Sequence, residues 1–299
     1  MFTNPKNQPR QVNLAAAAGP LRPSKGRRIL VLILVIGAAV GAAKFLTHYQ
    51  FTQFLAARVL SAQAPDHRLA KDSPLAQTLA GLVSAHPDLA VGVSIINLQN
   101  STTLNVGNQT PFDAASVTKV LTAAAFLKQV EAGTQSLAHP MGAYTAGYEL
   151  QEMVNISDND AWNLIMDQVG YPELETYAKS LGLSTYDVET NTVTPADEAR
   201  LLQLLYAGKL LNPADTQMLL SYMQNTNDED LIPAALPVSA TVYHKYGLLS
   251  GNLHDAAIIA DAKNGCILVI FTKGADDSDD ADRAALFRQI TSAVTGTLL

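Results

Sequence analysis

The order of strand-like and helical segments restricts the fold of this chain more than any other feature. Residues 89–97 and 102–106 are strand-like and flank a polar turn at 99–101, which predicts a β-hairpin. Five segments with apolar residues at helical spacing follow, at 117–129, 159–169, 172–181, 195–207 and 213–224. The chain then returns to three strand-like segments and a final helix, at 241–246, 256–260, 267–272 and 281–294.

Strands and helices do not alternate in this order, which argues against a doubly wound parallel sheet. Strands that open and close a domain, with helices between them, favour an antiparallel sheet. The sequence therefore predicts an α+β fold, in which an antiparallel sheet is flanked by helices and carries an inserted helical lobe.

An apolar segment near the N-terminus predicts a membrane anchor. Residues 29–43 are uninterrupted apolar sequence, and the predicted transmembrane helix extends to residue 46 because Lys44 can snorkel to the interface. Arg27 and Arg28 precede it, which predicts a cytoplasmic N-terminus and an exported domain. The alternative is a cleaved signal peptide, with cleavage among the small residues 39–43 and a secreted product.

We therefore expect four regions along the chain. Residues 1–28 are polar and basic and form a disordered tail. Residues 29–46 form the anchor, residues 47–86 a helical spacer, and residues 87–299 the folded domain.

Charge and cysteine content exclude several classes of protein. Residues 1–50 hold seven Lys or Arg and no acidic residue, and the rest of the chain holds 13 basic and 27 acidic residues. A chain this acidic after residue 50 has no basic surface for nucleic acid.

The single cysteine, Cys266, rules out an internal disulfide and lies in a strand-like run, where a buried residue is expected. The histidines show no ligand spacing, so no metal and no cofactor are expected.

Ser116 and Lys119 form the first candidate for catalysis. A serine hydroxyl needs a base at neutral pH, and a lysine three residues later on a helix lies on the same face. The lysine can act as that base only if burial or nearby positive charge lowers its pKa. At a helix N-terminus, the positive end of the helix and the Ser116 backbone N–H can stabilise an oxyanion. The alternative is a helix-capping serine beside an unrelated surface lysine.

Two further motifs follow in the chain. Ser157-Asp158-Asn159 supplies a second hydroxyl that can shuttle a proton and an amide that can orient a substrate, although it also fits a helix cap. Lys245-Tyr246-Gly247 ends a predicted strand, where a lysine supplies fixed charge and a glycine allows close approach to the backbone. An ordinary strand-end lysine is the alternative there.

Together the three motifs resemble those of the class A β-lactamases and penicillin-binding proteins, which carry S-x-x-K, S-D-N and K-T-G in this order. The resemblance spans about residues 87–297, including segments 150–170, 190–205 and 243–260 around the motifs. It implies that the domain is a serine hydrolase acting on β-lactams or peptidoglycan-like peptides.

The resemblance also implies roles for individual residues. Ser116 would form an acyl-enzyme, with Lys119 as its base, and Ser157 would pass a proton to the leaving nitrogen. Asn159 would hold the acyl-amide side chain. Lys245 would supply positive charge and help to bind a substrate carboxylate. The N–H groups of Ser116 and Leu248 would form the oxyanion hole, and Gly247 would let the substrate approach the backbone closely.

The chain departs from the family pattern after the second motif. The segment from Ser157 to Pro195 is short and lacks the Glu-x-x-Leu-Asn run whose glutamate drives deacylation in class A enzymes. Glu189 is the nearest acidic candidate, but its spacing is wrong. Without a base for water, an acyl-enzyme hydrolyses slowly.

The third motif departs as well. Tyr246 replaces the threonine of K-T-G and cannot place a small hydroxyl beside a substrate carboxylate; Ser250 is a possible substitute. His254 lies where the family often has an arginine, and a partly buried structural histidine is the alternative.

Three functions remain open from the sequence. The first is a class A β-lactamase-like hydrolase. The second is a DD-peptidase or penicillin-binding protein that acylates but deacylates slowly. The third is a non-catalytic envelope protein that keeps the fold for binding.

Overall fold

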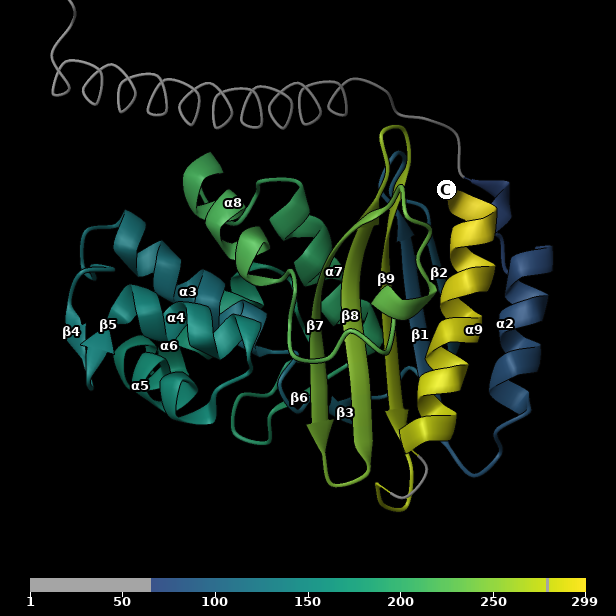
Figure 1. Ribbon diagram of the computed structural model, residues 1–299, viewed down its shortest axis with the longest axis horizontal. Helices are drawn as coiled ribbons and strands as arrows, with labels where there is room; N and C mark the ends of the chain where they lie inside the picture. Colours follow the sequence, from purple (N-terminus) through teal and green to yellow (C-terminus); the bar gives the residue numbers. More distant parts are fainter. Residues whose placement is uncertain (1–65, 278–279) are drawn as a thin grey trace, which may run out of the picture. The chain divides into compact units, whose positions relative to one another are not determined.

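A five-stranded antiparallel sheet forms the centre of the computed structural model, which describes residues 66–277 and 280–299. Figure 1 shows the strands in the order β2-β1-β9-β8-β7. Their bounds are Ala90–Asn97 for β1, Thr103–Gly107 for β2, Thr241–Leu249 for β7, Asn252–Ala260 for β8 and Gly265–Lys273 for β9. The pairing of β1 with β9 joins the first and last strands, so the predicted antiparallel sheet is confirmed.

Helices cover both faces of the sheet. α2 (Pro74–Ser84) and α9 (Asp280–Leu298) pack together on one face, and α7 (Pro195–Tyr206) packs against β1, β8 and β9 on the other (Figure 1). Side chains alternate between these layers: Val93 lies in the core under α2 and α9, whereas a Cβ atom at Gly92 would contact Pro195 of α7. Strands β8 and β9 are buried almost throughout because both of their faces are covered.

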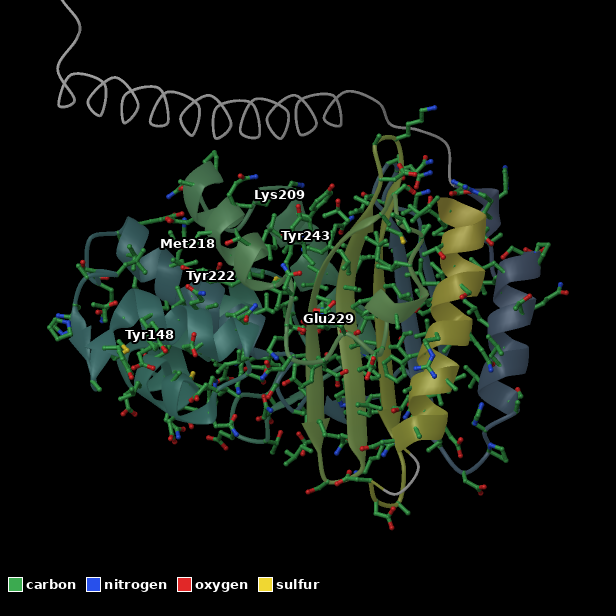
Figure 2. The ribbon with its side chains drawn as sticks, viewed as in Figure 1. Tyr148, Lys209, Met218, Tyr222, Glu229 and Tyr243 are labelled. Atoms are coloured by element: carbon green, nitrogen blue, oxygen red, sulfur yellow. The ribbon has the colours of Figure 1, made fainter. Side chains whose placement is uncertain are left out.

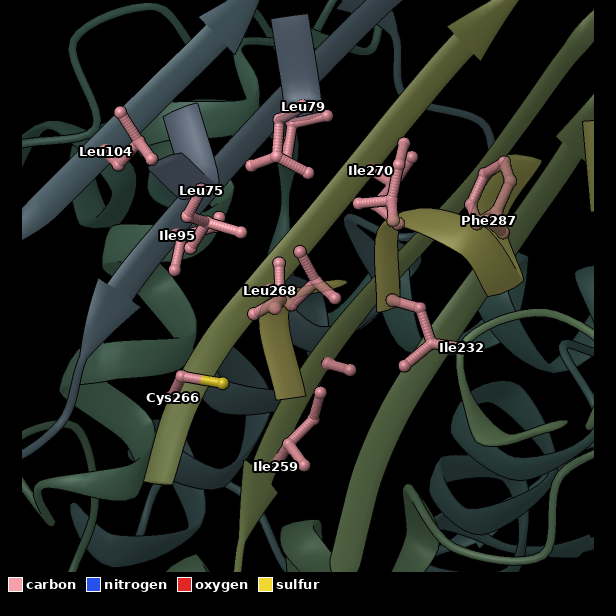
Figure 3. Packing of buried hydrophobic residues seen from close by; sticks show 14 of the residues in the cluster. Leu75, Leu79, Ile95, Leu104, Ile232, Ile259, Cys266, Leu268, Ile270 and Phe287 are labelled. Carbon is pink, nitrogen blue, oxygen red and sulfur yellow. The ribbon is translucent and has the colours of Figure 1, made fainter. Parts of the chain in front are cut away.

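The core between α2, α9 and the sheet contains part of the predicted spacer. Leu75 and Leu79 of α2 lie in one hydrophobic cluster with Phe287 of α9 and Leu268 of β9 (Figure 3). Residues 74–84, expected as spacer, therefore contribute to the domain core. Cys266 lies in the same cluster as expected, and burial raises the pKa of its thiol to about 12.

A helical lobe lies beside the sheet (Figure 1). Its helices are α3 (Lys119–Glu131), α4 (Ala146–Asn155), α5 (Asn159–Val169), α6 (Tyr171–Ser180) and α8 (Pro213–Tyr222). α3 is the centre of the lobe because it packs against each of the other four. The inserted lobe predicted from the order of segments is thus present.

Short elements connect these layers. β3 (Phe112–Asp113) pairs with β6 (Thr192–Val193), which joins the segment before α3 to the segment before α7. The remaining short elements are η1 (His67–Leu69), β4 (Pro140–Met141), β5 (Tyr144–Thr145) and η2 (Pro233–Ala235).

Three helices begin with a capping residue followed by proline. These pairs are Ser73-Pro74, Thr194-Pro195 and Asn212-Pro213 at the starts of α2, α7 and α8. Each cap side chain accepts a hydrogen bond from a free backbone N–H of the first turn. Proline at the first helical position has no N–H, so it leaves no donor without a partner there.

The described part of the chain contains no helix long and apolar enough to cross a membrane. The tail at 1–28 and the anchor predicted at 29–46 lie outside the described residues, as does the first part of the spacer.

The position of α2 in the core predicts the effect of shortening its buried side chains. Leu79→Ala leaves a cavity among buried residues and should lower the free energy of unfolding by about 2–5 kcal/mol. Thr78→Ala, one residue away on the exposed side of the same helix, should change it by less than about 0.5 kcal/mol. Urea unfolding of the two variants makes the comparison, and equal stabilities would show that α2 is not part of the core.

Candidate active site

Ser116 lies in a tight turn between β3 and α3. Ala115 has a φ of 47°, a left-handed conformation that is uncommon for alanine. Backbone bonds from Val117 N to Ala114 O and from Lys119 N to Ser116 O, both 3.2 Å, close the turn. Helix α3 begins at Lys119 with Thr118 as its N-cap residue, so Ser116 is not the helix cap. The capping alternative for this serine is therefore wrong.

Lys119 is buried and points to the Ser157-Asp158-Asn159 turn. Its Nζ donates to Ser157 O at 2.6 Å and to Asn159 Oδ1 at 2.7 Å. Longer contacts reach Asp158 O at 3.3 Å and Ser157 Oγ at 3.4 Å. The direct bond to Ser116 expected from helical spacing is not among these contacts, because Ser116 precedes the helix.

Burial sets the protonation of Lys119. Removal from water lowers the pKa of its ammonium to about 8, although the Asp158 carboxylate opposes the shift. The ammonium still predominates near neutral pH, but a minor fraction of the molecules carries the neutral amine, which can accept a proton.

The Ser157-Asp158-Asn159 turn both caps a helix and faces the lysine. Asp158 Oδ1 accepts from Ala161 N at 2.8 Å, as an N-cap residue of α5 does. Ser157 has a φ of 64°. Because Asp158 caps the helix, the side chains of Ser157 and Asn159 are not needed for capping, and both contact Lys119.

Strand β7 brings the third motif to the same place. Lys245 is fully buried, and burial together with the charge of Lys119 lowers its pKa to about 7. A Cβ atom on Gly247 would lie 3.0 Å from the backbone nitrogen of Ser116. The glycine therefore lets the strand approach the serine turn closely.

A cavity of about 340 Å³ opens beside Ser116, a volume suited to a small ligand. It is lined by Ala115, Ser116, Thr118, Lys119, Asn159, Trp162, Asn163, Asn191, Leu248 and Leu249. Three predicted side chains, those of Ser116, Lys119 and Asn159, thus share one cavity with Leu248. Trp162, expected from the sequence to be a core anchor, is only half-buried and lines the cavity.

His254 does not line the cavity, contrary to its expected role with a substrate carboxylate. The ring is fully buried: Nε2 donates to Asp113 O at 2.7 Å, and Nδ1 accepts from Thr272 N at 3.2 Å. Burial lowers its pKa to about 4, so the imidazole is neutral. The structural alternative holds for this residue, which ties β8 and β9 to the segment before Ser116.

Ser250 and Glu189 also lie away from the cavity lining. Ser250 is exposed at the turn between β7 and β8, with a φ of 46°. Glu189 is exposed in a turn closed by Asp187, whose Oδ1 accepts from Glu189 N at 2.9 Å. The geometry therefore supports neither the substrate role of Ser250 nor the deacylation role of Glu189.

Asn191 is a cavity residue that the sequence did not reveal. Its Oδ1 accepts from Thr118 Oγ1 at 2.8 Å, and its Nδ2 donates to Ala115 O at 2.9 Å. Its backbone oxygen accepts from Ala114 N at 2.8 Å. Its positive φ of 49° is a conformation that asparagine tolerates, but the long-range contacts have no local signal.

The opposite side of β7 is fixed by a buried histidine. His244 Nδ1 lies 2.9 Å from Asp255 Oδ1, and Nε2 lies 3.3 Å from Glu229, which Figure 2 labels beside the strand. Burial lowers the pKa of His244, but the two carboxylates outweigh it and raise the pKa to about 9. The protonated ring thus holds β7 to β8 and to the loop that contains Glu229.

Known proteins are similar to this chain in sequence and in fold. The sequence model of the β-lactamase enzyme family matches residues 74–298. A β-lactamase from Proteus vulgaris is 25% identical over 241 residues, which cover 69% of this chain and 89% of that protein.

Solved structures agree with the sequence comparison. The structure of PBP-A has a TM-score of 0.70 and 28% identity, and covers 80% of this chain and 98% of its own. A mutant of PBP-A, solved as an acyl-enzyme complex with penicillin G, has a TM-score of 0.68 and 28% identity, over 74% of this chain and 95% of its own. With its fold, its three ordered motifs and this family match, the chain belongs to the β-lactamase enzyme family and is a class A-like serine hydrolase.

Proposed function

We propose that this protein opens the amide bond of β-lactams, or of related peptidoglycan peptides, through an acyl-enzyme on Ser116. The observation that carries the proposal is the shared cavity of Ser116, Lys119 and Asn159, in which burial keeps the lysine partly neutral. The acyl-enzyme of a PBP-A mutant with penicillin G supports the class of ligand.

Acylation follows from the positions of these groups. Lys119 accepts the proton of Ser116 Oγ, directly or through a water molecule, as the oxygen attacks the carbonyl carbon. The N–H groups of Ser116 and Leu248 are our candidates for stabilising the oxyanion. Ser157 Oγ lies 3.4 Å from Lys119 Nζ, so the proton can pass through this hydroxyl to the leaving nitrogen.

Deacylation is the slow step in this proposal. Among the described residues that line the cavity, none carries a carboxylate, and Glu189 is exposed in a turn outside it. A hydrolytic water therefore has no dedicated carboxylate base. This favours a penicillin-binding protein or DD-peptidase with weak β-lactam turnover over an efficient β-lactamase. The lowered pKa of Lys119 favours either enzyme over a non-catalytic binding protein.

We also propose that residues 29–46 anchor the enzyme in a membrane with its N-terminus in the cytoplasm. The apolar run and the preceding Arg27 and Arg28 support this topology. A domain on the outer side of the membrane would meet peptidoglycan peptides there.

Turnover of a chromogenic cephalosporin should be biphasic. The full-length protein should release about one equivalent of product in a burst, followed by a steady rate about 10²–10⁴-fold slower, because the water lacks a positioned base. Ser116→Ala should abolish both phases. Glu189→Gln should change neither, and a selective loss of the steady phase in that variant would assign deacylation to Glu189. Steady turnover without a burst would contradict slow deacylation.

Acylation should depend on pH through Lys119. Only the neutral amine can accept the serine proton, so the second-order acylation rate should rise with pH and level off above about 8. Stopped-flow or gel measurement of penicillin labelling between about pH 6 and 10 gives this profile. Lys119→Arg keeps the charge but cannot release its proton, and should lower the plateau by about 10²–10⁴-fold. A flat profile in the unmodified protein would exclude Lys119 as the base.

A further inference from the structure

The first turn of α5 forms one wall of the cavity beside Ser116. Asn159, Trp162 and Asn163 all line that cavity. They lie three and four residues apart, so their side chains share one face of the helix. Asp158 caps α5 and fixes the position of this face. The wall therefore continues from Asn159, which binds the proposed base, along the first turn of α5.

The three asparagines that line the cavity differ in what their amides bind. Both ends of the Asn191 amide are bound within the serine turn. Asn159 uses its Oδ1 for Lys119, which leaves its Nδ2 to donate to a ligand. Asn163 is exposed, and no other described residue forms a hydrogen bond with its side chain. Its amide therefore offers a donor and an acceptor together, the combination that pairs with a peptide group.

Trp162 adds an aromatic surface beside these amides. It lines the cavity, and its side chain is only half-buried. A tryptophan that served the core alone would be covered by its neighbours, whereas this one remains partly exposed. An apolar group of a ligand can cover the exposed part of the indole and remove its surface from water.

This wall carries no charge, because its side chains are two amides and an indole. Of the described residues that line the cavity, Lys119 carries the positive charge, and it remains mostly protonated near neutral pH. An uncharged peptide group loses little on leaving water at Asn163, because the side-chain amide replaces its hydrogen bonds to water. The wall of α5 therefore suits a peptide group with an apolar side group.

The spacing along the helix determines how far a ligand must extend. At about 1.5 Å of rise per residue, Asn163 lies about 6 Å beyond Asn159 along the helix axis. Two residues of extended chain span about 7 Å. A ligand whose first amide is held by Asn159 therefore reaches Asn163 only if its chain continues beyond that amide.

We infer that Trp162 and Asn163 form a subsite for a second peptide group on the acyl side of the scissile bond, and that they determine the specificity of the enzyme. The favoured acyl donors carry one amide at Asn159, an apolar side group at Trp162 and a further amide at Asn163. The inference rests on the proposed acylation of Ser116 and specifies the class of acyl donor that this step prefers.

The test compares three penicillins that differ only on the acyl side. 6-Aminopenicillanic acid has no acyl group there, benzylpenicillin has one amide and a phenyl group, and N-acetylampicillin adds a second amide beside the phenyl group. Second-order acylation rate constants of the full-length protein are measured for each, normalised to its hydroxide-catalysed hydrolysis. N-acetylampicillin should react about tenfold faster than benzylpenicillin, the effect expected of one or two hydrogen bonds.

Asn163→Ala should reduce this ratio to about one, because the second amide loses its partner. A purely structural role of Asn163 would slow both penicillins equally, so an unchanged ratio would overturn the inference. Trp162→Ala should slow both phenyl-bearing penicillins about tenfold relative to 6-aminopenicillanic acid. Gln168→Ala is the matched control and should change neither ratio, because it removes an exposed amide of the same helix outside the cavity lining.

Equal normalised rates for benzylpenicillin and N-acetylampicillin in the unmodified protein would overturn the inference, even if Trp162→Ala failed to fold. A correctly folded Trp162→Ala variant with an unchanged ratio to 6-aminopenicillanic acid would also overturn it. Labelling of Ser116 by 6-aminopenicillanic acid reports the proposed acylation without the subsite. Labelling by none of the three penicillins would instead contradict the proposed acylation, and the inference with it.

Discussion

The contact between Lys119 and the Ser157-Asp158-Asn159 turn is the interaction on which the site depends. Residues 119–127 of α3 are all buried, so the lysine at the start of the helix cannot turn to water. Its ammonium is instead bound by the Ser157 carbonyl and the Asn159 amide. Burial costs a charged amine more than a neutral one, so the buried position of Lys119 between α3 and α5 lowers its pKa, and the neutral amine can then act as a base.

A second constraint is the position of the serine turn, which distant parts of the chain fix. Asn191, from the segment before α7, binds Ala114 and Ala115. His254, from the middle of the sheet, binds the carbonyl of Asp113. Gly247 brings β7 against the backbone nitrogen of Ser116. These contacts hold Ala115 in its left-handed conformation, which a local turn alone would not favour.

The bounds of a helix were predicted best where a capping residue begins it and a glycine ends it. The helix at 159–169 was predicted with the bounds that the structure shows, because Asp158 caps it and Gly170, with a φ of 82°, ends it. Strand β8 starts at Asn252, four residues earlier than predicted at 256, and its first part contains the buried polar residues Asn252, His254 and Asp255. Asn252 bonds locally to Leu249, whereas His254 and Asp255 bond to distant parts of the chain. A pattern of apolar residues cannot predict strand positions that polar residues occupy. α4 was not predicted as a separate helix.

The site residues that belong to short sequence motifs could be predicted from the sequence. The residues that tertiary contacts position could not. Ser116, Lys119 and Asn159 meet in one cavity as the motifs indicated. The burial of His254, the contacts of Asn191 and the ring of Tyr246 over Lys245 all join residues whose side chains give no local sign of their partners. These positions are where the site departs from expectations based on the family.

The central claim, that burial makes Lys119 a base, is tested most directly by titrating its side chain. Nuclear magnetic resonance of isotope-labelled lysine side chains in the full-length protein, with Lys119→Arg for assignment, reports the pKa of this group alone. We expect a midpoint near 8. A midpoint at the ordinary lysine value of 10.5 would show that the ammonium remains charged at neutral pH and would contradict the role of Lys119 as the base.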